Sequence, residues 1–383
     1  MKTGNLLFEK KILLSAGIYF LISAALLLKF GIQLGGEAEK YIENANLIIK
    51  GEELFNGVFG YFYIVYSLLV ALFIKLSVNF ILVAVVQIIL SFTAALYLYK
   101  LLHQCLKNKN VAFFFFIAYL LCYPIQKWNF FLYSESVHTS LLVFGIYFLN
   151  KWSNDKKINS LIYFGIVLLL ILFSRPVGVL FLMTFGIVLL VWLYQNRKKI
   201  LFYFFSCVGI ISVILILNSP FTAFINPDSI RRMEIICQVP ETGGNIEYHE
   251  YNRQGLYKAF AVIKNEVGVS NFFKNGLKKL QCFFGMYRNY YSTQNNLLLI
   301  CFTVFYPFAL IGIFSKQEKS FFYVRLFAVT YILFTSIGIF FTCDEWSNRF
   351  ISPVFPFVLI LAAAGSSTVI KKLFPLVKQR NDQ

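Results

Sequence analysis

Runs of about 20 apolar residues recur along this chain of 383 residues, and short charged stretches separate them. A bilayer core is about 30 Å thick, so a helix made from one such run is long enough to cross it. Hydrophobic residues form 58% of the chain and charged residues only 14%, which is more apolar surface than a soluble fold buries. Backbone polar groups in a bilayer must pair within the segment, so the chain is predicted to be an all-α integral membrane protein.

The apolar runs predict about ten transmembrane helices. They cover roughly residues 12–30, 80–101, 111–126, 131–150, 158–174, 176–195, 200–218, 296–315, 321–342 and 350–370. The first run is too long for the apolar core of a cleaved signal peptide, and residues 31–33 are a poor cleavage site. No internal repeat stands out, so we expect one polytopic membrane domain over residues 1–383.

The net charge of +17 comes mainly from Lys and Arg in the short loops between these runs. That distribution indicates orientation by the positive-inside rule rather than binding of nucleic acid. With the basic loops inside, both termini are expected to lie in the cytoplasm and the protein in the inner (plasma) membrane. The apolar run 59–76 is then expected to form an interfacial or shallow re-entrant helix on the outer face, because a further span there would turn the later basic loops outward.

This topology places two long segments on the outer face. The first outer loop, residues 31–79, is expected to hold amphipathic or interfacial helices, and residues 219–295 form a long outer segment. The stretch NFFKNGLKKLQCFFGMY within the latter is typical of a basic amphipathic surface helix. The chain has seven cysteines without CxxC spacing. Three of them, Cys237, Cys282 and Cys343, would lie outside, where two of the three could form a disulfide.

An acidic stretch, GGEAEKYIENANLIIKG, follows the first span at residues 35–51. Its apolar residues fall on one face of a helix, at Ala38, Tyr41, Ile42, Ala45, Ile48 and Ile49. The opposite face carries Glu37, Glu39 and Glu43. Glu37 would open the helix, where the helix dipole favours an acid, or would act as a general base. Glu39 and Glu43 are more typical of a solvated face.

Ionisable residues at the ends of spans are costly and are often functional. Glu135 begins a span, and its alternative role is a buried salt bridge with Lys127 or Arg175. His138 follows by three residues and shares the helix face with Glu135. Arg175 lies between two apolar runs, where it could bind phosphate or extend toward the interface.

Two further arginines are candidates for anion binding. Arg349 closes a short outer loop, with Asp344 and Glu345 as alternative ion-pair partners, and Arg288 lies where the long outer segment re-enters the membrane. Carboxylates that activate a hydroxyl, together with cations that hold a phosphate leaving group, are the groups needed to transfer a sugar from a lipid phosphate.

These residues resemble the motifs of the GT-C superfamily of polytopic membrane glycosyltransferases, which includes protein O-mannosyltransferases and aminoarabinose lipid A transferases. The similar positions are an acid after the first span with Tyr and small residues behind it, an "SE" at a span start, an "RP-x-G" corner and an "R-[YF]-x-x-P-x-x-P" entry to the last span. Here they fall at Glu37, Tyr41, Ala45 and Gly51, at Ser134–Glu135, at Arg175, Pro176 and Gly178, and at Arg349, Phe350, Pro353 and Pro356.

The resemblance implies a polyprenyl-phosphate sugar donor and a lipid, glycan or protein acceptor that meet on the outer face. It makes Glu37 the candidate base and Glu135 the second catalytic acid, and it assigns binding of the phosphate or donor to Arg175 and Arg349. We expect Arg288, Glu39, His138 and Tyr41 to contribute to substrate binding as well. The family's first acid is usually Asp, so either Glu37 or Glu39 could be the base here. Some branches use a divalent metal, but no ligand set is seen, and neither a metal nor another cofactor is predicted.

Two other classes of protein are open alternatives. An outer-leaflet polymerase of glycan repeat units would place its key arginines in two large outer loops, whereas this chain has one long outer loop and one acidic first loop. A transporter or lipid flippase would show paired repeats and charges in the middle of spans. The spans here are largely free of such charges apart from Arg325, so a transferase is favoured.

Overall fold

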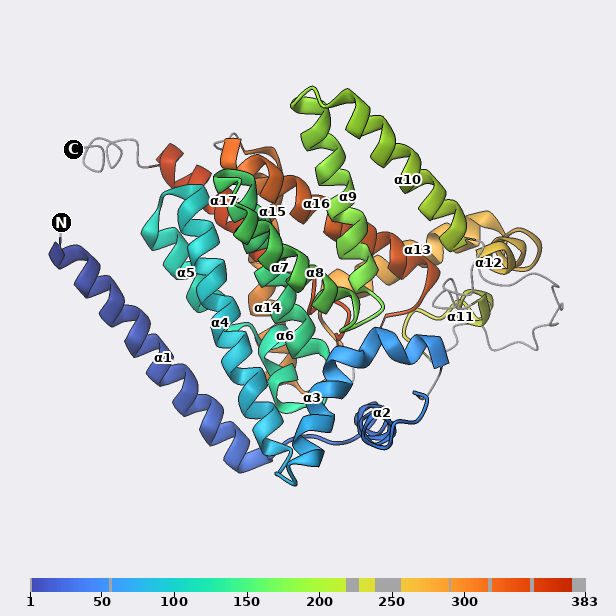
Figure 1. Cartoon of the computed structure of the whole chain (residues 1–383), viewed down its shortest axis with the longest axis horizontal. Coiled ribbons are helices and arrows are strands. Elements are labelled where there is room, and N and C mark those ends of the chain that lie inside the picture. The colour runs from blue at the N-terminus through green and yellow to red at the C-terminus, as the bar shows by residue number, and fades with distance from the viewer. Residues whose placement is uncertain are drawn as a thin grey trace. The chain divides into compact units, whose positions relative to one another are not determined.

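The computed structural model describes residues 2–54, 57–217, 227–237, 256–288, 291–315, 319–344 and 348–373. In these ranges the backbone is helical apart from turns, loops and two isolated β-bridges (Figure 1), as expected for an all-α membrane protein. Six helices there are long and apolar enough to cross a membrane: Glu9–Phe30, Ile81–Leu106, Gly178–Gln195, Thr293–Phe314, Phe321–Phe341 and Phe355–Leu373. The larger count of about ten spans stays a prediction.

The chain divides into two compact units; two of the divisions fall inside α9 (Gly178–Gln195) and α16 (Lys319–Phe341), and the other two fall just before Phe305 and Phe355. The first unit comprises Met1–Leu182, Phe305–Ala328 and Phe355–Gln383, and the second comprises Met183–Val304 and Val329–Val354. The first unit holds α1 (Lys2–Phe30), α2 (Ala38–Lys50), α3 (Ile64–Lys75), α4 (Ile81–Leu106), α5 (Lys109–Leu121), α6 (Tyr123–Gln126), α7 (Glu135–Asp155), α8 (Ile158–Leu172), α15 (Phe305–Phe314) and α17 (Phe355–Leu373).

Helix α17 forms the core of the first unit, because every residue from 355 to 365 is buried. Small residues let α15 approach it closely. A Cβ at Gly312 would collide with the Leu361 carbonyl oxygen, and one at Gly365 with the Phe308 carbonyl oxygen. Close approach of this kind favours packing between helices in lipid, where the hydrophobic effect contributes little. Helix α1, in contrast, is mostly exposed, as suits a span that faces lipid.

The predicted span 111–126 is broken in the structure. Helix α5 begins with the Asn108 side chain capping the backbone N–H groups of Asn110 and Val111, each at 3.1 Å. It ends at Leu121, and the chain bends by 49° into the segment Tyr123–Phe130. Pro124 lies just beyond the bend, where its ring prevents α5 from continuing.

Residues 31–79, the predicted first outer loop, contain helices, as expected from the sequence. Helix α2 ends at Gly51, whose φ of 73° closes the last turn through its N–H and the Ile48 carbonyl. Helix α3 follows a short 3-10 helix, Gly57–Tyr63, and has 12 residues. At 1.5 Å per residue it extends for about 18 Å, well short of the roughly 30 Å bilayer core. Its length therefore agrees with an interfacial position for the run 59–76.

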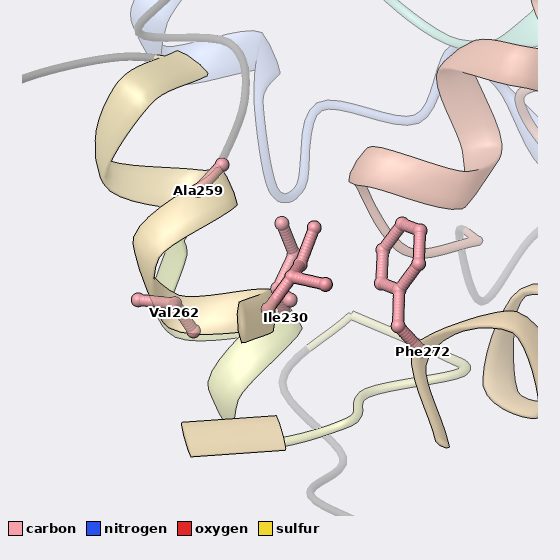
Figure 2. Packing of buried hydrophobic residues seen from close by; sticks show 5 residues of the cluster. Ile230, Ala259, Val262 and Phe272 are labelled. Atoms are coloured by element: carbon pink, nitrogen blue, oxygen red, sulfur yellow. The ribbon is translucent and has the colours of Figure 1, made fainter. Parts of the chain in front are cut away.

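The second unit has its own apolar cluster and a covalent link. Ile230 of α11 (Pro227–Arg231), Ala259 and Val262 of α12 (Leu256–Val262), and Phe272 of α13 pack together with Ile263 (Figure 2). Helix α13 (Val269–Gly285) is the amphipathic surface helix expected from the sequence.

Cys237 and Cys343 form a disulfide in the second unit, across 106 residues of sequence. Residues beside the disulfide form one of the isolated β-bridges, in which the Asp344 N–H donates to the Ile235 carbonyl at 2.8 Å. One of the disulfides left open by the sequence is therefore formed, and Cys282 keeps a free thiol.

Candidate functional site

Residues 31–79, the predicted first outer loop, lie directly against the segment Phe130–Glu135 that leads into α7. The Gln33 N–H donates to the Phe130 carbonyl at 2.8 Å, and the Leu132 N–H donates to the Gln33 carbonyl at 3.0 Å. These two bonds make a short parallel bridge between segments about 100 residues apart in sequence. The acidic loop and the Ser134–Glu135 corner are thereby held together within the first unit.

Tyr133 fixes the start of the acidic helix. Its hydroxyl donates to the Gly35 carbonyl at 2.9 Å and accepts from the Glu37 N–H at 3.1 Å. Gly36 makes this contact feasible, because its φ is +66° and any Cβ there would collide with the Tyr133 hydroxyl. The glycine at position 36 therefore has a structural reason that the sequence did not reveal.

A second tyrosine ties the buried face of α2 to the same corner. The Tyr41 hydroxyl is 2.8 Å from the Ser134 hydroxyl, and both side chains are buried. The Tyr41 ring packs edge-on against Tyr66 of α3, with 4.8 Å between ring centroids. Tyr41 thus aligns α2 with the N-terminus of α7, and the structure gives this predicted substrate-binding residue a positioning role.

Glu37 occupies the N-cap position of α2 but makes no side-chain cap hydrogen bond. Its carboxylate is 40% exposed and lies 3.5 Å from the Lys40 ammonium, which also sits over the Tyr63 ring at 3.7 Å. Glu39 and Glu43 are exposed on the side of α2 away from its buried face. Of the three acids in α2, Glu37 is the one whose backbone is bonded to the corner, which favours it over Glu39 as the acid of the site.

Glu135 and Arg175 form a buried ion pair, one of the two alternatives predicted for Glu135. The Arg175 Nη1 lies 2.8 Å from the Glu135 Oε1, and the side chains are 5% and 0% exposed. The two groups form an ion pair without a hydrogen bond between these two atoms, because the Nη1–H groups do not point at Oε1. Glu135 starts α7 and Arg175 starts the turn into α9, so this pair joins two of the predicted corners.

His138 lies one turn into α7 and contacts the Arg175 corner. Its Nδ1 is 2.7 Å from the Ser174 hydroxyl, which itself donates to the Ile171 carbonyl at 2.8 Å. Because the serine hydroxyl donates to that carbonyl, we assign the imidazole hydrogen to Nδ1, which makes Nε2 the acceptor. Within the described chain, the buried Nε2 has no hydrogen-bond partner.

A polar network beneath this corner was missed in the sequence. The Asn129 Oδ1 accepts a hydrogen bond from the Ser136 hydroxyl at 2.5 Å. The Asn129 side-chain NH2 donates to the Tyr19 hydroxyl of α1 at 3.2 Å and to Gln126 at 2.8 Å. The Gln87 amide of α4 donates to the Asn129 and Phe131 carbonyls, each at 3.0 Å. Amide and hydroxyl groups inside apolar runs were the available signal, and such groups need partners in a bilayer.

The predicted span 131–150 is displaced by these same polar groups. Helix α7 begins only at Glu135 and runs to Asp155. Its first turns bury Glu135, Ser136, His138, Thr139 and Ser140. These polar residues leave α7 outside the set of helices that are apolar enough to be counted as candidate spans. Because they are buried, they face the protein interior rather than lipid.

The remaining candidates lie in the second unit. Arg288 forms a buried ion pair with Asp344, and its Nη1 donates to the Cys282 carbonyl at 2.8 Å. Asp344, one of the two partners predicted for Arg349, is therefore engaged by Arg288. Glu345, the other, lies outside the described residues. Arg349 is 5% exposed and follows Asn348, whose amide donates to the Met286 carbonyl at 2.8 Å.

Within the described ranges, no group of three or more His, Cys, Asp and Glu side chains is arranged to hold a metal ion. The first unit thus collects Glu37, Tyr41, Glu135, His138 and Arg175 around one corner, and we call these residues the corner site. No family model, curated protein or solved structure matches this chain. Membership of the GT-C superfamily therefore stays a prediction, and function must be argued from the corner site itself.

Proposed function

We propose that the protein is a glycosyltransferase that moves a sugar from a polyprenyl-phosphate donor to an acceptor hydroxyl on the outer face of the membrane. The observation that carries the proposal is the junction of the acidic helix α2 with the Glu135–Arg175 pair. Hydrogen bonds from Tyr133 and Tyr41 fix Glu37 and Glu135 at adjoining helix starts. An exposed carboxylate, here Glu37, can act as a general base. A buried carboxylate–guanidinium pair, here Glu135 and Arg175, can hold a phosphate leaving group.

Glu37 is the proposed general base. Its carboxylate is the exposed one, so an acceptor can reach it from water or from the interface. The acceptor oxygen attacks the anomeric carbon and loses its proton to Glu37, while the bond from that carbon to the phosphate oxygen breaks. The products are the glycosylated acceptor, polyprenyl phosphate and a protonated carboxyl that returns its proton to solvent.

Arg175 is the proposed contact for the donor phosphate, and Glu135 orients it. A guanidinium can contact a carboxylate and an oxyanion at the same time, because it has five N–H donors in a planar fork. Its Nη1 contacts Glu135, and its buried Nε has no hydrogen-bond partner among the described residues, so this N–H can meet a phosphate. His138 presents a bare Nε2 one turn into α7, where it can accept a hydrogen bond from a sugar hydroxyl.

The Cys237–Cys343 disulfide supports an outer orientation for the loop that carries Arg349. Disulfides persist in oxidising compartments and are rare on the cytoplasmic side of a membrane. Cys343 directly follows α16, a candidate span, so that end of the helix belongs on the oxidising side. The same orientation puts the basic loops inside, in agreement with the positive-inside rule.

Reconstituted protein supplied with labelled polyprenyl-phosphate sugars tests the proposal. We expect at least one sugar donor to be consumed, with release of polyprenyl phosphate that depends on an added acceptor, detected by mass spectrometry of the lipid fraction. Release of lipid diphosphate instead would indicate the repeat-unit polymerase. Transport of intact lipid without cleavage would indicate the flippase.

A further inference from the structure

Helix α13 of the second unit has three distinct faces. Its buried face packs onto the unit through Phe272, Asn275, Gly276, Lys279 and Phe283. The adjacent face exposes an apolar stripe of Val269, Phe273 and Leu277, which are 54%, 55% and 63% exposed. A third face exposes Lys274 and Lys278. At about 100° per residue, residues four apart stay on one side, so the stripe and the lysine pair form two separate lines along the helix.

The buried face places α13 at the end of a candidate membrane span. Residues Phe321–Phe341 of helix α16 are a candidate membrane span. Helix α13 packs across the C-terminal end of this span. A Cβ at Gly276 would collide with the Phe340 ring, and the Phe272 ring lies 5.5 Å from that of Phe341 between centroids. The Lys279 ammonium donates to the carbonyls of Phe340 and Thr342. Because a span ends where the bilayer core ends, α13 lies at the level of the lipid headgroups.

We propose that α13 is a binding site for anionic phospholipids at this membrane surface. Phe273 and Leu277 enter the boundary between headgroups and acyl chains, and Lys274 and Lys278 contact the phosphates beside them. A large apolar stripe flanked by lysines is the arrangement by which interfacial helices select anionic over zwitterionic lipid. The charge selects this occupant, because a zwitterionic headgroup has no net negative charge to balance the two lysines.

The site is independent of the corner site and of the proposed sugar transfer. All of its residues belong to α13, which lies in the second unit. A second copy of the chain as the occupant would bury the stripe without regard to the lipid charge. That case is therefore separated from lipid binding by changing only the headgroup.

The full-length protein carrying Leu277→Trp, in nanodiscs of phosphatidylcholine, reports on this site. A tenth of the lipid is brominated and is either phosphatidylglycerol or phosphatidylcholine. Quenching of the added tryptophan's fluorescence by the brominated lipid is obtained by subtracting the signal of the unsubstituted protein. We expect brominated phosphatidylglycerol to quench about twofold more than brominated phosphatidylcholine, because the lysines enrich anionic lipid locally. The excess should disappear at high salt, because salt screens the lysine–phosphate attraction.

The double variant Lys274→Gln/Lys278→Gln should abolish the excess and retain the quenching by phosphatidylcholine. The matched control, Lys371→Gln/Lys372→Gln at the end of α17, removes the same charge from exposed positions elsewhere and should keep the excess. Equal quenching by the two lipids before any lysine is changed would overturn the proposal. Absence of quenching by either lipid would overturn it too, since the stripe would then be covered by protein.

Discussion

At the scale of single residues, the buried Glu135–Arg175 pair carries a large free-energy cost of desolvation. Two charges that are 0% and 5% exposed have lost their hydration and depend on each other. Removing one partner leaves the other as an uncompensated charge, which costs about 3–5 kcal/mol, whereas removing both costs much less. The pair therefore couples stability to function if Arg175 also holds the donor phosphate.

We expect Glu135→Gln to lower the free energy of unfolding by about 3–5 kcal/mol. Adding Arg175→Gln to it should restore part of that loss, because no unpaired charge remains. Thermal unfolding in detergent measures both effects. Glu43→Gln, at an exposed position on α2, should change stability by less than about 0.5 kcal/mol. Strictly additive losses from Glu135→Gln and Arg175→Gln would show that the two charges do not interact.

Lys279 predicts a specific dependence of stability on pH. Burial lowers its pKa from 10.5 to about 8, against the opposing effect of Glu234. Between about pH 8 and 10.5 the unfolded chain binds the proton and the folded protein does not, so the free energy of unfolding rises with pH. From pH 7.5 to 9 the gain is about 1 kcal/mol.

The Lys279→Met variant should lack this gain, because it has no proton to release. Thermal unfolding of both proteins at the two pH values gives the difference directly. The same increase in both would mean that other groups titrate and that Lys279 is protonated throughout.

At the scale of elements, the apolar runs predicted most helices and several of their ends, such as Phe30 of α1 and Gln195 of α9, but not the breaks within a run. Hydropathy averages over a window, so it detects the apolar character of α4 or α17 but not a break within a run. Helix α5 ends at Leu121 although the apolar run continues. The start of α7 depends on Asn129, Ser136 and Gln87, whose hydrogen bonds reach other helices and leave no local pattern in the sequence.

The contact between α15 and α17 carries a prediction at this scale. Gly312→Ala and Gly365→Ala each force the two backbones apart, because the added methyl collides with a carbonyl oxygen of the other helix. We expect each to cost about 1–3 kcal/mol, as overpacking does. Gly338→Ala is the matched control, since a Cβ there meets nothing within 4 Å. It should be neutral or slightly stabilising by helix propensity, and an equal loss in all three would contradict close packing.

At the scale of the whole molecule, the predicted topology depends on the first outer loop remaining outside. Helix α3 has 12 residues, and the Val65 N–H donates to the Phe173 carbonyl at 3.1 Å, which ties the loop to the Arg175 corner. A helix too short to cross the bilayer core, bonded to the end of α8 (Ile158–Leu172), supports the predicted interfacial position.

A cysteine introduced at Lys75, the exposed last residue of α3, tests this orientation in intact cells. A membrane-impermeant maleimide should label Lys75→Cys from outside. A cysteine at Lys10 should react only after permeabilisation, which provides the opposite control. Labelling of Lys75→Cys only in permeabilised cells would show that the run 59–76 spans and would reverse the later loops.

The residues of the corner site were predictable by type but not by arrangement. Glu37, Glu135 and Arg175 stood out because ionisable groups at span ends are costly. Their proximity depends on Tyr133 and Gly36, and neither residue has a charge or spacing that would mark it in a sequence. The pairing of Arg288 with Asp344 was equally hidden, because Asp344 is next to a cysteine whose disulfide partner the sequence could not specify.

Sugar transfer by the Glu37→Gln protein is the most direct test of the central claim. Glutamine preserves the size of the side chain and the N-cap position but cannot accept a proton, so transfer from a labelled polyprenyl-phosphate sugar should fall by at least about 100-fold. Unfolding temperature should stay unchanged, and Glu43→Gln, an exposed acid of the same helix, should transfer sugar normally. Full transfer by Glu37→Gln would contradict the assignment of the base, and the proposed mechanism would fail with it.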